Sequence, residues 1–204
     1  MLIIPAILTN DPNIARELLE KVEAAAVDRV QIDVIDGKFS NNKTVDPILF
    51  RDVDARLLLD YQLMVVDPIN WVEKCIHAGA DRIIGHVEKM SDQLEFVAKA
   101  QSVGARVGLG LDLTTPIESI DEEVVKDLDV VLVMSVPAGF GGQKFDPKVL
   151  DKIKKLADIR EKDHTPFKIC VDGGITKDNI QDLENAGADE VSIGAKRFFE
   201  QFSP

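Results

Sequence analysis

The chain has little cysteine, no excess of basic residues and no long apolar run, and each shortage excludes a class of protein. Of its 204 residues only Cys75 and Cys170 are cysteines, too few for a disulfide scaffold, and their apolar neighbours predict two buried free thiols. With 24 basic and 36 acidic residues the net charge is −12, so nucleic acid, which requires a basic face, is not an expected partner. No apolar run is long enough to span a membrane.

The amino terminus also lacks the basic segment that precedes the apolar part of a secretory signal. We therefore expect a cytoplasmic protein that has no membrane partner. Hydrophobic residues make up 45% of the chain, as in ordinary globular proteins, and the length fits one domain over residues 1–204. Because the net charge is negative, an anionic ligand would have to be held by local N–H groups and helix N-termini.

Apolar strands and helical segments alternate eight times along the chain. Strands are predicted at 2–8, 29–34, 57–66, 82–87, 105–111, 129–134, 167–171 and 190–193. Helices are predicted from Asp11 onward, then at 68–78, 91–102, 115–126, 148–161, 176–186 and 196–202, with a short or irregular one within 47–56. Ile14, Leu18, Leu19 and Val22 are expected to be the buried stripe of the first helix, and Ser91 the N-cap of the helix at 91–102.

Eight such units predict an α/β fold, a (β/α)8 TIM barrel. A doubly wound open sheet is the alternative. The chain lacks the Gly-x-Gly-x-x-Gly sequence that such a sheet would carry after its first strand when it binds a dinucleotide, and this absence favours the barrel.

Three consecutive predicted strands end in small residues. The strand at 129–134 is followed by a loop with four breakers, Pro137, Gly139, Gly141 and Gly142; the next ends in Asp172-Gly173-Gly174 and the last in Gly194-Ala195. Backbone N–H groups of such loops bind phosphate, and (β/α)8 barrels place phosphate after strands 7 and 8. The alternative is a set of tight turns that bind no ligand.

Alternation along the strands predicts which polar side chains enter the barrel. Gln31 and Asp33 are expected to point inward from the second strand, since a carboxylate does not face an apolar helix layer, and Gln62 and Met64 from the third. Asp172 ends the seventh strand. Two carboxylates on opposite sides of one substrate suit a proton transfer in which one base removes a proton and the other delivers one. The alternative is that both aspartates only fix turns.

Five segments together resemble the ribulose-phosphate 3-epimerase family: residues 33–37 (DVIDG), 63–65 (LMV), 134–136 (MSV), 139–145 (GFGGQKF) and 171–174 (VDGG). They occur in family order, and the similarity extends over residues 4–194. The resemblance implies a ribulose-phosphate-binding (β/α)8 barrel that epimerises a ketose phosphate through an enediolate, as an isomerase of pentose phosphate carbohydrate metabolism. A sugar phosphate is the expected ligand and a homo-oligomer the expected assembly.

The resemblance also assigns site residues. Asp33 and Asp172 match the two aspartates that act as acid and base. The positions expected to bind substrate or its phosphate are Ala6, Met64, Met134, Gly139, Phe140, Gly141, Gly142, Gly173, Gly174, Gly194 and Ala195.

Two histidines of the family pattern are missing. Gln31 and Gln62 stand where the family has histidines that, with the two aspartates, hold a divalent metal. An amide offers a neutral oxygen in place of the imidazole that suits zinc and iron. No cofactor is therefore assigned, and only weak binding of a divalent metal is expected at Gln31, Asp33, Gln62 and Asp172. Both positions hold the same residue, which suggests a retained polar site with changed chemistry.

Other departures keep alternatives open. Ala6 and Ala195 replace serines of the family, and Pro137-Ala138 replaces Asn-Pro. Related barrels that include hexulose-phosphate synthase carry Asp-x-Lys-x-x-Asp on the third strand, of which only Asp60 is present here. A metal-free isomerase or lyase of the same barrel group, or a non-catalytic phosphosugar-binding protein, therefore remains an alternative to an epimerase. His86 could line the site, replace a lost ligand, or be a core histidine.

Overall fold

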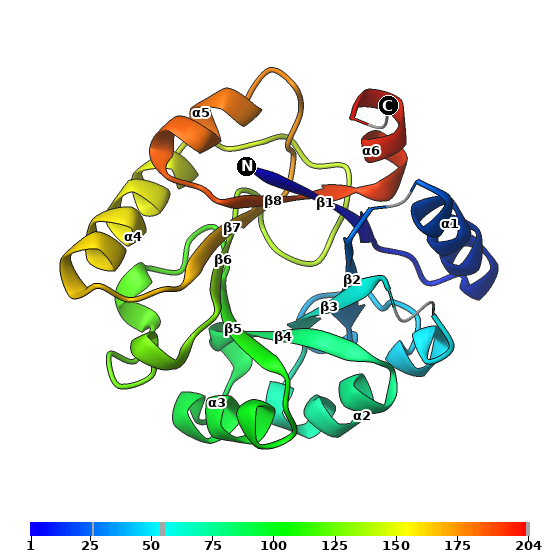
Figure 1. Ribbon diagram of the computed structural model, residues 1–204, viewed down its shortest axis with the longest axis horizontal. Coiled ribbons are helices and arrows are strands. Elements are labelled where there is room, and N and C mark those ends of the chain that lie inside the picture. Colours follow the sequence, from blue (N-terminus) through cyan, green and yellow to red (C-terminus); the bar gives the residue numbers. More distant parts are fainter. Residues whose placement is uncertain (26, 54–55, 203–204) are drawn as a thin grey trace.

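The computed structural model describes residues 1–25, 27–53 and 56–202, and its parallel strands form one closed barrel (Figure 1). Each strand pairs with the next along the chain, and the last pairs with the first. The strands are β1 (Leu2–Ile7), β2 (Arg29–Ile35), β3 (Leu58–Met64), β4 (Ala80–His86), β5 (Arg106–Leu111), β6 (Val130–Met134), β7 (Lys168–Asp172) and β8 (Glu190–Gly194). The predicted (β/α)8 barrel is confirmed, with small shifts at the strand ends.

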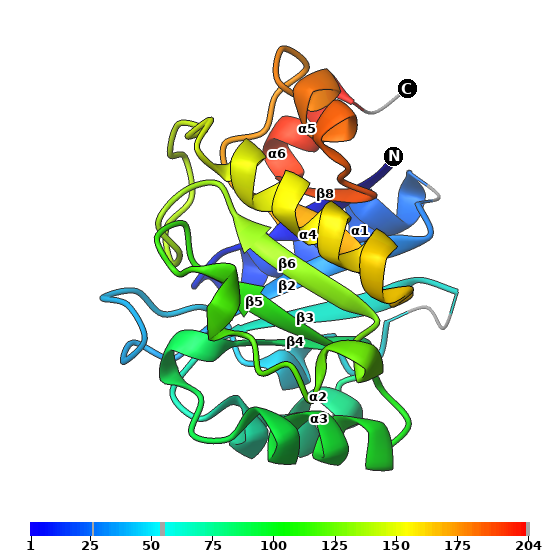
Figure 2. The same ribbon diagram turned by 90° about the vertical axis from the view of Figure 1, so that its left-hand side faces the viewer.

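Helices cover the outside of the barrel (Figures 1 and 2). The α-helices are α1 (Pro12–Ala24), α2 (Val72–His77), α3 (Gln93–Ser102), α4 (Val149–Asp163), α5 (Ile180–Ala186) and α6 (Ala195–Gln201). The 3-10 helices are η1 (Pro47–Phe50), η2 (Pro68–Trp71), η3 (Val87–Lys89), η4 (Ile117–Ser119) and η5 (Val125–Asp127). Within the described residues, no helix is both long and apolar enough to cross a membrane.

The helix predicted at 115–126 is wrong, because that stretch contains only η4 and η5. The carbonyl of Thr115 would accept an early intrahelical hydrogen bond, but it accepts one from Lys152 Nζ on α4 at 2.7 Å. The same amine bonds the carbonyls of Asp112 and Leu113. A contact with a distant lysine therefore holds this segment as a loop.

Two local predictions for the helices are also corrected. The N-cap of α3 is Asp92, whose carboxylate accepts from Glu95 N at 2.8 Å, and not Ser91, whose own N–H donates to Asp67. In α1, Ala15 is buried in the stripe with Leu18 and Val22, whereas Ile14 is 36% exposed. The predicted stripe was one position off at its start.

Alternation along the strands separates two apolar cores. Side chains such as Val30 and Tyr61 belong to the core between strands and helices. A smaller core that includes Ile84 and Leu132 fills the barrel itself. Gln31 and Gln62 point into the barrel, as predicted, and Cys75 and Cys170 are buried and free, also as predicted.

Paired charges close the amino end of the barrel. Asp60 is fully buried and accepts hydrogen bonds from both Arg29 and Arg82. Arg82 also bonds Glu190, which is 2% exposed, at 2.8 Å. These four side chains lie at or near the starts of their strands, whereas the cavity described next lies at the strand ends.

Candidate active site

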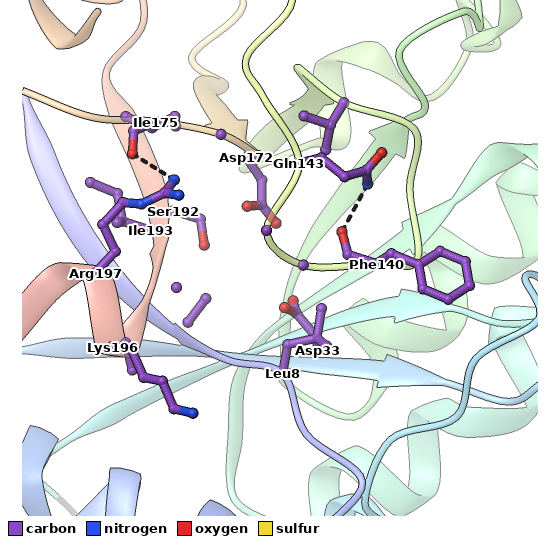
Figure 3. A pocket seen from close by; sticks show the side chains of 18 of the residues that line it. Leu8, Asp33, Phe140, Gln143, Asp172, Ile175, Ser192, Ile193, Lys196 and Arg197 are labelled. Atoms are coloured by element: carbon purple, nitrogen blue, oxygen red, sulfur yellow. Dashed lines mark hydrogen bonds between the residues drawn. The ribbon is translucent and has the colours of Figure 1, made fainter. Parts of the chain in front are cut away.

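A cavity of about 420 Å³ lies at the carboxyl ends of the strands. Figure 3 shows Asp33 and Asp172 facing it, beneath the loops that follow β6 and β7. The lining includes every position assigned from sequence to catalysis or substrate binding: Ala6, Asp33, Met64, Met134, Gly139, Phe140, Gly141, Gly142, Asp172, Gly173, Gly174, Gly194 and Ala195. The fold therefore brings these positions around one space.

Gln31 is at the centre of a polar cluster at the base of this cavity. Its Nε2 lies 2.8 Å from Asp33 Oδ1 and 2.9 Å from Asp172 Oδ2. It also lies 2.6 Å from Gln62 Oε1. An amide nitrogen carries two hydrogens, so two of these three acceptors are served at a time. The two carboxyls, which come from β2 and β7, thus meet around one nitrogen.

The environment favours a proton on the carboxyl pair. Burial, and then the charge of Asp172, raise the pKa of Asp33 well above its usual value, against the hydrogen bond from Gln31. Burial raises the pKa of Asp172 to about 6, although Gln31, His86 and the Gly173 N–H oppose the rise. Two buried carboxyls in contact with one amide resist being ionised together. These surroundings favour one protonated and one ionised carboxyl over two ionised ones.

Gln62 connects the carboxyl pair to a histidine. The atom of its amide that faces the two carboxyls (the outer atom) lies 2.8 Å from Asp172 Oδ2 and 3.0 Å from Asp33 Oδ1. The other, inner atom lies 3.0 Å from His86 Nε2. His86 Nδ1 in turn lies 3.1 Å from Glu88 Oε2. Of the three possibilities for His86, the structure shows a buried ring joined to the site through Gln62.

Two of the glycines are required by close packing of the site loops. A Cβ on Gly139, where φ is +110°, would lie 2.3 Å from Ser40 Oγ. A Cβ on Gly174, where φ is +61°, would lie 2.3 Å from the backbone nitrogen of Phe145. Any larger residue would therefore push apart loops that pack against each other at the carboxyl end of the barrel.

The segment at residues 38–46 lies beside the loop after β6 and projects beyond the strand ends in Figure 2. Asn42 Nδ2 donates to the carbonyl of Gly139 at 2.8 Å, which joins the segment to the loop after β6. Thr44 Oγ1 accepts from the N–H of Ile35 at 2.9 Å. The segment is therefore joined to a loop that lines the cavity.

Among the lining residues that the sequence analysis did not assign to the site are Ser192, Lys196 and Arg197. Arg197 Nη1 donates to the carbonyl of Ile175 at 3.2 Å, so its guanidinium lies beside the loop after β7 (Figure 3). Ser192 Oγ is buried and has no hydrogen-bond partner among the described residues. The signal was present for the two cations, which directly follow Gly194-Ala195.

The cluster does not fit the metal that the family pattern implies. Gln31 presents N–H to both carboxylates, and an amide nitrogen is not a metal ligand, while its Oε1 is buried without a partner within the described part of the chain. No imidazole replaces the two missing ones, because His86 touches the amide of Gln62 instead. Among the described residues no group of three or more His, Cys, Asp or Glu side chains could hold a metal ion.

These features define a class of protein. A closed parallel barrel with acidic side chains at its carboxyl end and glycine-rich loops after β6 and β7 is a (β/α)8-barrel enzyme whose site lies at that end. The chain belongs to the ribulose-phosphate 3 epimerase family, whose model matches residues 2–198. It is therefore an epimerase-type isomerase.

Curated relatives agree with this membership. The chain is 35% identical to ribulose-phosphate 3-epimerase of Synechocystis sp. over 97% of its own length and 87% of that protein. It is 35% identical to the Bacillus subtilis enzyme of the same name, over 94% of its length and 89% of the relative. It is 37% identical to a chloroplastic ribulose-5-phosphate-3-epimerase of Arabidopsis thaliana, over 97% of its own length and 72% of that protein.

Solved structures show the same fold at lower identity. A 3-hexulose-6-phosphate synthase superposes with a TM-score of 0.71 at 18% identity, over 100% of this chain and 94% of that one. A structure described as native KDPGal superposes with a TM-score of 0.65 at 17% identity, over 98% and 90%. At such identities the likeness concerns the barrel alone.

Proposed function

We propose that the protein epimerises a ketose phosphate, as its relatives named ribulose-phosphate 3-epimerase do, without a bound metal. The observation that supports this best is the meeting of Asp33 and Asp172 at Gln31 Nε2, 2.8 and 2.9 Å away, at the base of the cavity. Two carboxyls this close, one protonated and one ionised, suit the removal of a proton from the carbon beside a ketone and its return on the other face.

The pKa directions assign the first roles. Asp172, with its pKa near 6, is ionised at neutral pH and is the base. Asp33, whose pKa is raised well above its usual value by burial and by the charge of Asp172, is the acid. Asp172 takes the proton from carbon 3, the electrons of the C–H bond enter the enediolate, and Asp33 O–H protonates the opposite face of carbon 3. The reverse reaction begins with Asp172 protonated and Asp33 ionised.

An enediolate needs hydrogen-bond donors for its oxyanion. The Nε2 hydrogens of Gln31 already point at the carboxylates, so an oxyanion that replaces one acceptor would receive a bond from a preorganised donor. One such donor is worth about 3–4 kcal/mol in comparable sites. A neutral amide supplies less than a divalent cation, so we expect slow turnover, or a substrate whose proton is more acidic than that of ribulose 5-phosphate.

The phosphate end is proposed to lie at the loops after β6, β7 and β8. Backbone N–H groups there need no particular side chain to bind an anion. Ala6 and Ala195 each remove a hydroxyl worth roughly 0.5–1.5 kcal/mol. Lys196 and Arg197 line the same side of the cavity and supply positive charge that compensates for this loss.

Exchange of substrate hydrogen with solvent tests the proposal. The purified protein is treated with a chelator and incubated in D2O with ribulose 5-phosphate, and then with other ketopentose and ketohexose phosphates. Deuterium at carbon 3 is followed by NMR, which detects proton transfer even when net turnover is slow. We expect exchange with at least one of these sugars, and no formation of the epimer with Asp33→Asn, which keeps the base Asp172 but lacks the acid.

Two outcomes would reject the proposal. Binding of a sugar phosphate in calorimetry without any exchange would identify a phosphosugar-binding protein, which the loss of both histidines favours. Exchange at another carbon, or cleavage of the sugar, would identify a metal-free isomerase or lyase of the same barrel group.

A further inference from the structure

His86 is a buried side chain for which the proposed reaction gives no role. It ends β4, and its ring is 0% exposed. Nδ1 lies 3.1 Å from Glu88 Oε2, and Nε2 lies 3.0 Å from the inner amide atom of Gln62. His86 thus links an acidic residue to the amide that touches both carboxyls.

The surroundings of the ring hold it in this place. A Cβ on Gly110 would lie 2.8 Å from His86 Cδ2 and 2.9 Å from Nε2, so the absence of a side chain on β5 makes room for the ring. Phe39 packs edge-on against the ring, with centroids 5.3 Å apart. The position of His86 is therefore determined by packing, and only its hydrogen bonds decide its tautomer.

Glu88 decides that tautomer. Its Oε1 accepts from the Asp112 N–H at 2.6 Å, which leaves Oε2 facing His86. Burial raises the pKa of Glu88, but His86, Thr115 and the Asp112 N–H together lower it to about 2. An ionised carboxylate only accepts hydrogen bonds, so the hydrogen of the neutral ring lies on Nδ1 and Nε2 is left as an acceptor.

The lone pair on Nε2 sets the orientation of Gln62. Its NH2 group must be the inner end, donating to His86, and its carbonyl oxygen the outer end. Gln31 supports this, because its Nε2 lies 2.6 Å from the outer atom and must find an oxygen there. The rotated amide could donate to Asp172 and Asp33, but it would place two nitrogens that both carry hydrogens only 2.6 Å apart, and its oxygen would need a hydrogen on His86 Nε2.

We propose that Glu88 and His86 form a positioning pair that keeps the carbonyl oxygen of Gln62 turned toward Asp33 and Asp172. This oxygen lies 2.8 and 3.0 Å from the two carboxyl oxygens. Oxygens that all accept hydrogen bonds repel one another at these distances, so one carboxyl must donate an O–H to the Gln62 oxygen. The positioning pair therefore keeps one proton on the two carboxyls, ready for delivery. The inference rests on the proposed function for its catalytic consequence but not for its geometry.

Nitrogen NMR of the free protein shows which ring nitrogen of His86 carries the hydrogen. The chain has three histidines, so the ring signals of His86 can be assigned by comparison with His77→Gln and His164→Gln. In the neutral ring we expect the hydrogen on Nδ1 and an unprotonated Nε2. A hydrogen on Nε2 of the neutral ring would overturn the proposal, whether or not epimerase activity is found.

Glu88→Gln reverses the arrangement without changing its shape. The Asp112 N–H requires an oxygen, so the carbonyl of the introduced amide would face Asp112 and its NH2 would face Nδ1. The ring then carries its hydrogen on Nε2, and Gln62 must turn its NH2 outward. We expect the NMR signature to invert, and kcat to fall by roughly 10- to 100-fold, as for other supporting residues, with KM changed less than about twofold.

Two control variants distinguish a change of tautomer from a general structural defect. Glu118→Gln, an exposed residue in the loop after β5, should leave the His86 signals and kcat as in the parent. Gly110→Ala displaces the ring by steric contact and should lower kcat to a similar extent, which keeps the test available if Glu88→Gln folds poorly. If Glu88→Gln inverts the tautomer of His86 but leaves kcat unchanged, the proposed effect on catalysis is wrong. If the tautomer does not change, the proposed orientation of Gln62 is wrong.

Discussion

Asp172 carries its charge at a cost to the stability of the folded protein. Burial raises its pKa from 3.8 to about 6, so the folded state binds a proton more tightly than the unfolded state does. The free energy of unfolding therefore falls as the pH rises from about 3.8 to about 6, and then stays lower. Near neutral pH, this cost is about 3 kcal/mol at most, from about 1.4 kcal/mol for each pKa unit.

Asp172→Asn should consequently be inactive and more stable than the parent protein at about pH 8, by up to about 3 kcal/mol. This gain in stability should disappear at a pH below the pKa that Asp172 has in the unfolded chain, because position 172 is then neutral in both proteins. Urea denaturation at several pH values, with deuterium exchange as the activity assay, checks both effects. A variant that is less stable than the parent at pH 8 would contradict the assigned pKa direction.

We expect Gln31 and Gln62 to determine whether the site binds a metal. The outer atom of Gln62 lies 2.6 Å from Gln31 Nε2 and 2.8 to 3.0 Å from the carboxylates, so imidazole nitrogens placed there would converge with them on one point. We expect the parent to purify with far less than one zinc per chain and to be insensitive to chelators. Gln31→His combined with Gln62→His should gain zinc binding and faster turnover of ribulose 5-phosphate.

Elemental analysis and the epimerase assay measure these two effects. Near-stoichiometric zinc in the parent would contradict the fit argument. Zinc binding by the double variant without faster turnover would show that the site has diverged beyond these two positions.

Arg197 is expected to act on affinity rather than on turnover. It lies beside the loop after β7 through its bond to Ile175, and it lines the cavity. A hydrogen bond to a charged group is worth about 1.5–3 kcal/mol, so Arg197→Gln should raise KM for a sugar phosphate by about 10-fold or more, with a smaller change in kcat. Lys155→Gln, exposed on α4, is the control. An equal loss of kcat would place Arg197 at the reacting atoms instead.

At the scale of elements, the loops after β2 and β6 depend on each other. Gly139 has φ of +110° and no room for a Cβ beside Ser40 Oγ. Gly139→Ala should separate the two loops, raise KM and lower amide protection at residues 38–46 and 139–145, while the strands keep theirs.

Adding Ser40→Gly separates the two causes, because it removes the steric contact but not the strain of a positive φ. The amide protection of these loops, measured by hydrogen exchange and mass spectrometry, should then recover in part. Unchanged protection in Gly139→Ala alone would mean that the loops do not rely on this contact.

At the scale of the whole molecule, stability and function lie at opposite ends of the barrel. Asp60 is buried between Arg29 and Arg82 at the amino end, and removing one partner from a buried ion network costs about 3–5 kcal/mol. Asp60→Asn should lower the free energy of unfolding by about this amount and leave kcat unchanged at low temperature.

The matched control is Asp52→Asn, an aspartate paired with Arg51 but 85% exposed at its side chain. Such surface pairs contribute about 0–1 kcal/mol. Chemical denaturation of both variants measures the difference. Similar small effects in both would mean that the buried network is dispensable.

The order of the elements followed from local patterns. The apolar runs, the alternation that turns Gln31 and Gln62 inward, and the glycine loops are properties of neighbouring residues, so the sequence alone indicated the barrel and the residues that line its cavity. The same holds for the family segments. Errors arose where two local signals competed, as at Ser91 and Asp92, or where a distant group intervened, as Lys152 does at Thr115.

What only the tertiary structure decided was how the polar groups meet. Gln31 and Asp172 are 141 positions apart in the chain yet 2.9 Å apart in space. The tautomer of His86 follows from Glu88, and Arg197 faces the cavity because α6 begins directly at the end of β8. Closing the barrel brings the carboxyl ends of all eight strands together, so local patterns determined the elements, and the closure determined the chemistry between them.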